Sequence, residues 1–87
     1  MRFSFPYPTC VEALNHPVGL AQPAELLDLA RRIEDHGLYA LWSTDHLVPW
    51  AAAHIDVEVG PPNWYDILIA MACVASVTST VKLGLGV

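Results

Sequence analysis

The sequence predicts an α/β fold in which parallel strands alternate with helices, and the order of its apolar segments supports this. Short, strongly apolar segments at residues 2–7, 38–43 and 81–87 alternate with two helix-like segments, which begin at Pro23 and Ile67. A helix between consecutive strands lets both strands run in the same direction. This β-α-β-α-β order is typical of an eight-stranded barrel and of a doubly wound sheet. The 87 residues are enough for one small domain, covering residues 1–87.

The first strand is predicted at Arg2–Tyr7, where β-prone residues are followed by proline. Thr9–Gln22 then has the composition of a loop. The first helix begins at Pro23, since proline is favoured at the first helical position, and Gly37 ends it as a glycine after a helix commonly does. Apolar residues recur between them at helical spacing, with charged residues on the other side: Leu26, Ala30 and Ile33.

The second strand, Leu38–Ser43, is short and almost continuously apolar, which is typical of a parallel strand buried on both faces. A long connection, Thr44–Tyr65, follows, and a connection of this length in a compact domain is usually functional. Asp66 is placed to cap a second helix, Ile67 to about Thr78. That helix is apolar on nearly every side, so we expect it to be covered all round, with the thiol of Cys73 buried.

The charge and composition exclude several classes of function. With a formal net charge of −5 and four basic residues, the chain has no basic patch for nucleic acid or for an anionic membrane. It has two cysteines, too few for a disulfide framework. It has no apolar segment that resembles a signal peptide, and no apolar run near the roughly 18 residues that span a bilayer. We therefore expect a cytoplasmic protein. Hydrophobic residues make up 54% of the chain and charged residues 15%, a balance that fits part of a larger core better than an independent small domain.

The candidate catalytic residues are Asp45 and His46, which directly follow the second predicted strand. Ligands of parallel α/β folds gather at the carboxyl ends of the strands, so this placement favours a functional role. Histidine titrates near neutral pH and can transfer a proton there. The neighbouring carboxylate can orient it, and Trp50 can line an apolar pocket. The alternative is that Asp45 caps a turn and His46 is exposed to solvent.

Two other patterns carry weaker signals. His54, Asp56 and Glu58 alternate with apolar residues and could share one face of a strand, as metal ligands would. No other ligand completes the site, so a half-exposed strand is the simpler interpretation and we expect no metal. Gly84-Leu85-Gly86 could open a dinucleotide-binding turn, which requires a third glycine and a following helix. Alternatively, Gly86 permits unusual backbone geometry or lets a ligand lie against the main chain.

Taken in order, these segments resemble the luciferase-like monooxygenase family of barrel oxidoreductases, which use FMN or the deazaflavin coenzyme F-420. The matching stretches are PAELLDLARRIEDHGLYALWSTDHLVPW and NWYDILIAMACVASVTSTVKLGLGV. The resemblance covers Arg2–Val87. It implies that the chain is the N-terminal β-α-β-α-β segment of a (β/α)8 TIM barrel, incomplete by itself, with the cofactor at the carboxyl ends of the strands.

The resemblance also implies roles for individual residues. An Asp-His pair after the second strand is typical of the F-420 branch, so coenzyme F-420 is favoured over FMN, and Asp45 and His46 resemble its pocket residues. Trp50 matches a pocket tryptophan of some F-420-dependent dehydrogenases. A bulge in the third strand that backs the deazaflavin, often with a non-proline cis peptide, would fall at Gly86-Val87.

The favoured hypothesis is part of an oxidoreductase that transfers hydride, or activates oxygen, on a small organic substrate. We expect it to be inactive alone, because later strands of the family barrel normally supply most phosphate-binding groups and the substrate pocket; family members often form homo-oligomers. The second hypothesis is a non-catalytic truncated protein or an interaction module that needs a partner chain, since three parallel strands leave two open edges through which the chain could associate. A doubly wound nucleotide-binding domain is the third, and it fits the Asp-His loop and the capped second helix less well.

Overall fold

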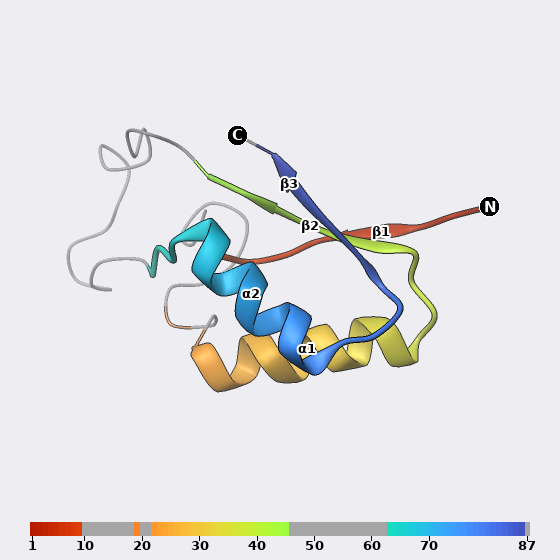
Figure 1. Cartoon of the computed structure of the whole chain (residues 1–87), viewed down its shortest axis with the longest axis horizontal. Coiled ribbons are helices and arrows are strands. Elements are labelled where there is room, and N and C mark those ends of the chain that lie inside the picture. The colour runs from red at the N-terminus through yellow and green to blue at the C-terminus, as the bar shows by residue number, and fades with distance from the viewer. Residues whose placement is uncertain (10–18, 20–21, 46–62, 87) are drawn as a thin grey trace.

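The computed structural model describes residues 1–9, 19, 22–45 and 63–86, and it confirms the β-α-β-α-β order (Figure 1). The elements are β1 (Ser4–Pro6), α1 (Pro23–Asp35), β2 (Ala40–Thr44), α2 (Ile67–Val77) and β3 (Lys82–Gly86). The strands form one parallel sheet in the order β1-β2-β3, so β2 is the central strand. This is the arrangement expected of the N-terminal part of an α/β barrel.

The strands begin and end where their backbone pairing does, which differs slightly from the predicted ranges. β2 starts at Ala40 rather than Leu38, because the Leu38 N–H still donates to the Ile33 carbonyl oxygen at the end of α1 (3.2 Å). It extends to Thr44, which pairs with Gly86 of β3. β1 is likewise shorter than the predicted first strand.

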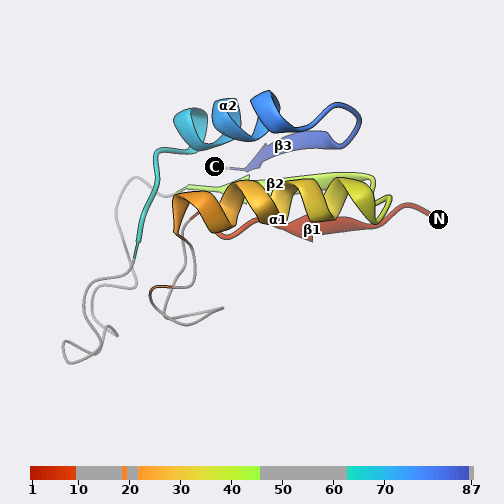
Figure 2. The same ribbon diagram turned by 90° about the horizontal axis from the view of Figure 1, so that it is seen from below.

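Both helices lie on one face of the sheet (Figures 1 and 2), and the hydrophobic core fills the space between. Leu41 of β2 is fully buried against them. The core draws on both helices and on the strands and their flanks: Tyr7, Leu26, Ala30, Ile33, Leu41, Ile67, Met71, Val74 and Val81.

The opposite face of the sheet is covered by no described helix, and we call it the helix-free face. Side chains alternate across a strand, and residues paired between parallel strands share a face. The helix-free face therefore carries Trp42 and Thr44 of β2 and their partners Gly84 and Gly86 of β3. Trp42 is 48% exposed, so the prediction that the second strand is buried on both faces is wrong for the described residues.

The ends of α1 follow the predicted signals. Pro23 is its first residue, and the backbone N–H of the preceding Gln22 donates to the Glu25 carboxylate (3.1 Å). Gly37, beyond the helix end, has a φ of 73°, in the left-handed region that glycine adopts without steric cost. The predicted apolar stripe of this helix is buried: Leu26, Ala30 and Ile33.

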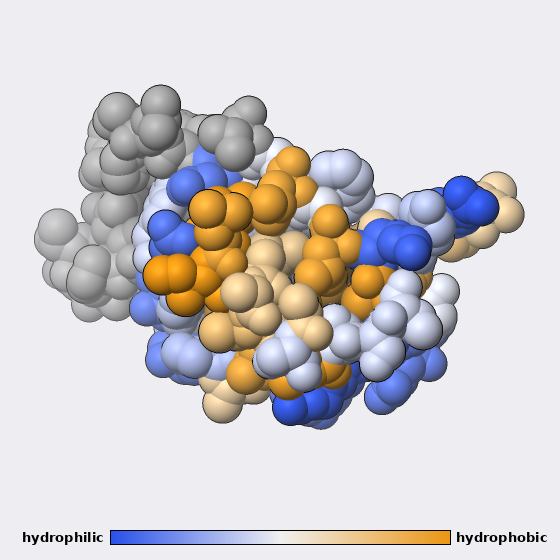
Figure 3. Space-filling model, in the orientation of Figure 1, coloured by the Kyte–Doolittle hydropathy of each residue, from blue (hydrophilic) through white to orange (hydrophobic). Residues whose placement is uncertain are grey.

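α2 begins at the predicted cap but is covered on one side only by described residues. The Asp66 carboxylate accepts a hydrogen bond from the Ile69 N–H (3.0 Å). Leu68 and Ile69 are 66% and 67% exposed, and Figure 3 shows apolar side chains gathered over this helix. Cys73 is also exposed, so the predicted burial of its thiol is wrong, because it lines the open groove between α1 and α2. Within the described residues, no helix combines the length and the apolar character needed to cross a bilayer.

The Glu34 carboxylate of α1 joins the helical layer to the start of β3. It accepts hydrogen bonds from the backbone N–H groups of Val81, Thr80 and Ser79 (2.9, 2.6 and 2.8 Å). These bonds favour the charged carboxylate and lower the pKa of Glu34 from 4.5 to about 2. The turn between α2 and β3 is thereby fixed against α1, which positions β3 beside β2.

Candidate active site

The carboxyl ends of the three strands lie at one edge of the sheet, as parallel pairing requires (Figure 1). Tyr7 continues from β1, and its N–H donates to the Trp42 carbonyl oxygen (2.7 Å). Asp45 follows β2, and its N–H donates to the carbonyl oxygen of Gly86 at the end of β3 (3.1 Å). We call this edge, with Tyr7, Thr44, Asp45 and Gly86, the carboxyl edge. It is the edge at which parallel α/β folds bind their ligands.

Asp45, one of the two predicted catalytic residues, is half-buried at the carboxyl edge. Its Oδ1 accepts a hydrogen bond from the indole Nε1–H of Trp64 (3.0 Å), which lies in the segment leading into α2. A hydrogen bond to a carboxylate is charge-assisted and stronger than one between neutral groups. Asp45 is therefore held through its backbone and through its side chain, at the position that directly precedes His46.

The other predicted site residues, His46, Trp50 and Val87, lie outside the described residues, and their roles stay predictions. The alternating segment 54–58, considered above as a weak metal-site candidate, lies outside them as well. Among the residues that are described, no group of three His, Cys, Asp or Glu side chains is arranged to hold a metal ion.

Trp42 and Gly84 form a close pair on the helix-free face. A Cβ atom on Gly84 would lie 2.4 Å from the indole ring of Trp42, which is far inside any ordinary contact distance. Gly84 and Gly86 both belong to β3. The glycine at position 84 therefore makes room for an aromatic ring within a strand, and the glycine pair does not form a dinucleotide-binding turn.

Gly86, at the carboxyl edge, has a different environment. The described glycines with positive φ are Gly19 and Gly37, so Gly86 does not provide unusual backbone geometry of that kind. A Cβ atom at Gly86 would come no nearer than 3.8 Å to the side chain of Thr44, an ordinary contact. No described residue requires glycine at position 86, which is consistent with the alternative interpretation, a ligand lying against the main chain.

Two hydroxyl side chains are fully buried beside the carboxyl edge. Thr9 Oγ1 and Ser43 Oγ hydrogen-bond to each other, which satisfies two polar groups that burial would otherwise leave without water. The Thr9 carbonyl oxygen also accepts a hydrogen bond from the Tyr65 N–H (2.9 Å). These contacts join the chain after β1 to β2 and to the segment that leads into α2.

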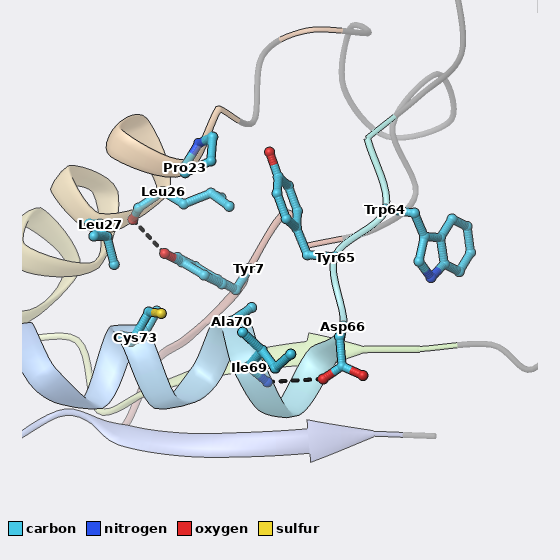
Figure 4. A pocket seen from close by; sticks show the side chains of 11 residues that line it. Tyr7, Pro23, Leu26, Leu27, Trp64, Tyr65, Asp66, Ile69, Ala70 and Cys73 are labelled. Carbon is cyan, nitrogen blue, oxygen red and sulfur yellow. Dashed lines mark hydrogen bonds between the residues drawn. The ribbon is translucent and has the colours of Figure 1, made fainter.

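A groove of about 370 Å³ opens between the N-terminal halves of α1 and α2 (Figure 4), lined mostly by apolar side chains. Within it the Tyr7 hydroxyl donates to the Leu26 carbonyl oxygen. Burial raises the pKa of Tyr7 well above its ordinary value, so the phenol stays protonated at neutral pH. The groove belongs to the helical layer, and neither of the described predicted site residues, Asp45 and Gly86, lines it.

The structure adds three features that sequence reasoning missed: the Trp64 indole on Asp45, the Trp42 ring over Gly84, and the buried Thr9–Ser43 pair. Trp64 gave a weak signal, since it stands two residues before the predicted cap of the second helix. The partners in each of these pairs are 19 to 42 positions apart, so no local pattern connects them.

Comparison with known protein families gives one match. The family model described as luciferase-like monooxygenase matches residues 1–87. No curated protein and no solved structure matches the chain.

Proposed function

The chain belongs to the luciferase-like monooxygenase family, and from this premise we propose that it is the N-terminal part of a flavin- or F-420-dependent oxidoreductase. The reaction is hydride transfer, or oxygen activation with FMN, on a small organic substrate, and coenzyme F-420 is the favoured cofactor. The site lies at the carboxyl edge, around the Asp45-His46 step that follows β2.

The environment of Asp45 is the observation that carries this proposal. Its carboxylate is bonded to the Trp64 indole (3.0 Å) and its backbone N–H to Gly86 (3.1 Å). A carboxylate used to orient a neighbouring histidine must itself be held in place, and the Trp64 indole does this here. The backbone bond to Gly86 continues the pairing of β2 with β3, whereas the bond to Trp64 is made by the Asp45 side chain itself.

The described residues near this step fit a flat, largely apolar cofactor ring. Trp42 lies on the helix-free face, two residues before Thr44 in β2, and presents a half-exposed indole. Gly86 presents main chain without a Cβ atom. Binding sites for such ligands typically combine apolar and aromatic walls with a few polar groups, and Asp45 supplies one of these.

The cofactor and the individual residues then have separate roles. The cofactor, when bound, supplies the redox chemistry. His46 holds or releases a proton at its imidazole, and Asp45 orients that imidazole. Trp50 lines the pocket, while Gly86 and Val87 back the ring.

The proposal is tested on the native gene product, whose intact mass is recorded first and compared with the reading frame beyond codon 87. Free coenzyme F-420 and FMN are then titrated separately, and binding is followed by the fluorescence of each cofactor. In a gene product that extends beyond residue 87 to about the length of a full barrel, we expect one of the two to bind. Binding of neither cofactor would contradict the proposed function.

The role of His46 is tested in the full-length parent protein with His46→Ala. We expect turnover to fall by about 100-fold or more, the usual contribution of a positioned acid or base, with cofactor still bound. The matched control is His36→Ala, because His36 is exposed at the end of α1, away from the carboxyl edge. Undiminished turnover in His46→Ala would remove His46 from the mechanism.

A second candidate function, an interaction module that needs a partner chain, is favoured by the exposed side of α2. Leu68 and Ile69 are about two-thirds exposed there. Leaving neighbouring apolar side chains of this size in water costs free energy that a partner surface would recover. Light scattering and thermal melting test it. A monomer with a cooperative melt would count against dependence on a partner.

A further inference from the structure

Trp64 leads into a short segment whose next two residues are both held by hydrogen bonds. The next residue, Tyr65, donates its backbone N–H to the Thr9 carbonyl oxygen (2.9 Å), which ties the segment to the chain after β1. Asp66 then caps α2 through the Ile69 N–H (3.0 Å). Figure 4 shows Trp64 and Tyr65 on opposite sides of this segment, and both belong to the lining of the groove between α1 and α2.

The indole of Trp64 reaches from this anchored segment to the end of β2. Its Nε1–H donates to Asp45 Oδ1 (3.0 Å), and the pair is partly buried. An indole has one donor and no acceptor, and its ring has few side-chain torsions, so it holds an ionised carboxylate at a defined place. Because the Asp45 backbone N–H also donates to the Gly86 carbonyl oxygen, the ends of β2 and β3 and the segment before α2 meet at this one residue.

We propose that Trp64 is the residue that positions the Asp45 carboxylate, the described half of the Asp45-His46 step, acting from the start of α2 through its indole hydrogen bond. This inference rests on the proposed function, because the step matters only if it serves the cofactor site. Trp64 is a positioning residue and does not itself touch the reacting atoms. Displacing a catalytic group by about 1 Å is enough to lower the rate by about 100-fold. Loss of the Trp64 hydrogen bond to Asp45, the residue before His46, should therefore lower the rate measurably.

The hydrogen bond is tested first, in the chain alone and without any cofactor. In ¹⁵N-labelled protein the three tryptophans give three indole N–H signals, and Trp64→Phe identifies that of Trp64. We expect Asp45→Ala, which removes the acceptor, to shift the Trp64 signal far more than the other two. An unmoved Trp64 signal would overturn the inference without bearing on cofactor binding.

The positioning role is then tested in the full-length parent protein, by the affinity for free coenzyme F-420 and FMN and by turnover. Trp64→Phe keeps the aromatic ring and removes the donor, and we expect kcat to fall by about tenfold, the effect of losing one hydrogen bond to a charged group, while the KM of the organic substrate is unchanged. Tyr65→Phe is the matched control, because Tyr65 is the adjacent aromatic residue on the other side of the segment, and it should behave as wild type.

A double variant separates positioning from general support of the fold. If Trp64 acts through Asp45, adding Trp64→Phe to Asp45→Ala causes no further loss of kcat. Additive losses, or a wild-type kcat in Trp64→Phe, would refute the positioning role while leaving the proposed function intact. If the wild-type protein binds neither cofactor, the proposed function fails and the positioning role fails with it, even where the indole signal confirms the bond.

Discussion

Replacing Gly84 by alanine is expected to destabilise the sheet through its contact with Trp42. The new Cβ atom would lie 2.4 Å from two ring carbons of the indole, whereas carbon atoms in contact stay about 3.5–4.0 Å apart. The ring or β3 must therefore move by about 1 Å or more. β3 is paired with β2 along its whole length, so the strand resists this movement and the ring is the part that yields.

The size of the effect follows from overpacking. Inserting a methyl group where no space exists typically costs about 1–3 kcal/mol. Trp42 is half-exposed, so its ring can swing toward solvent, which places Gly84→Ala nearer the lower limit. In a domain of this size a loss of 1 kcal/mol lowers the melting temperature by about 4–8 °C. We therefore expect a decrease of at least about 4 °C.

The assay is thermal and urea denaturation followed by circular dichroism, with Gly86→Ala as the matched control. Gly86 is in the same strand and on the same face, but its Cβ would come no nearer than 3.8 Å to any described side chain. Gly86→Ala should therefore be neutral, or stabilising by up to about 1 kcal/mol, because alanine restricts the unfolded chain. The proposed function adds that Gly86→Ala weakens cofactor binding without this loss of stability.

A Trp42→Ala protein tests whether the contact between the indole and position 84 causes the loss of stability. In a Trp42→Ala protein the obstructing ring is gone, so adding Gly84→Ala should cost nothing further. Equal losses of stability at positions 84 and 86, or an undiminished loss in the Trp42→Ala background, would show that the contact between ring and glycine is not the cause.

Three further substitutions test contacts that hold the fold. Glu34→Gln should lower the free energy of unfolding at neutral pH. Because the pKa of Glu34 is lowered from 4.5 to about 2 on folding, the difference in stability between variant and wild type is largest above pH 4.5 and shrinks as the pH falls toward 2. A difference that stays constant across this pH range would contradict the three backbone bonds. Leu41→Ala removes a fully buried side chain from the central strand and should cost about 2–5 kcal/mol, measured by urea denaturation; a loss below that of Gly84→Ala would be inconsistent with its central place in the core. Asp66→Ala removes the cap of α2 and should cost about 1 kcal/mol, visible as reduced helical signal and a lower melting temperature, whereas an unchanged melt would mean that α2 does not depend on its cap.

Much of the fold could be predicted because its signals are local. The cap at Asp66, the proline at position 23 and the glycine at position 37 each act within one helical turn, and the structure confirms all three. The alternation of strands and helices, and the family itself, were likewise predicted from the order of segments. The burial of Cys73 was predicted wrongly, because an apolar helix does not reveal which of its sides a neighbour covers.

The candidate site was predicted only in part: for Asp45, the position along the chain could be predicted but the side-chain contact could not. Its place after a strand could be read along the chain, as could the adjacent His46, which lies outside the described residues. Its bond to Trp64, 19 residues away, could not.

The sequence by itself determined which elements form, their order and the family, because helix caps, turn glycines and apolar periodicity depend on residues a few positions apart. Only the tertiary structure decided which side chains meet: Trp64 with Asp45, the Trp42 ring with Gly84, and Glu34 with the turn before β3. These pairings depend on the register of the sheet and on the packing of the helices against it. A shift of one residue in a strand would move each of its side chains to the opposite face of the sheet, and the paired residues would no longer meet.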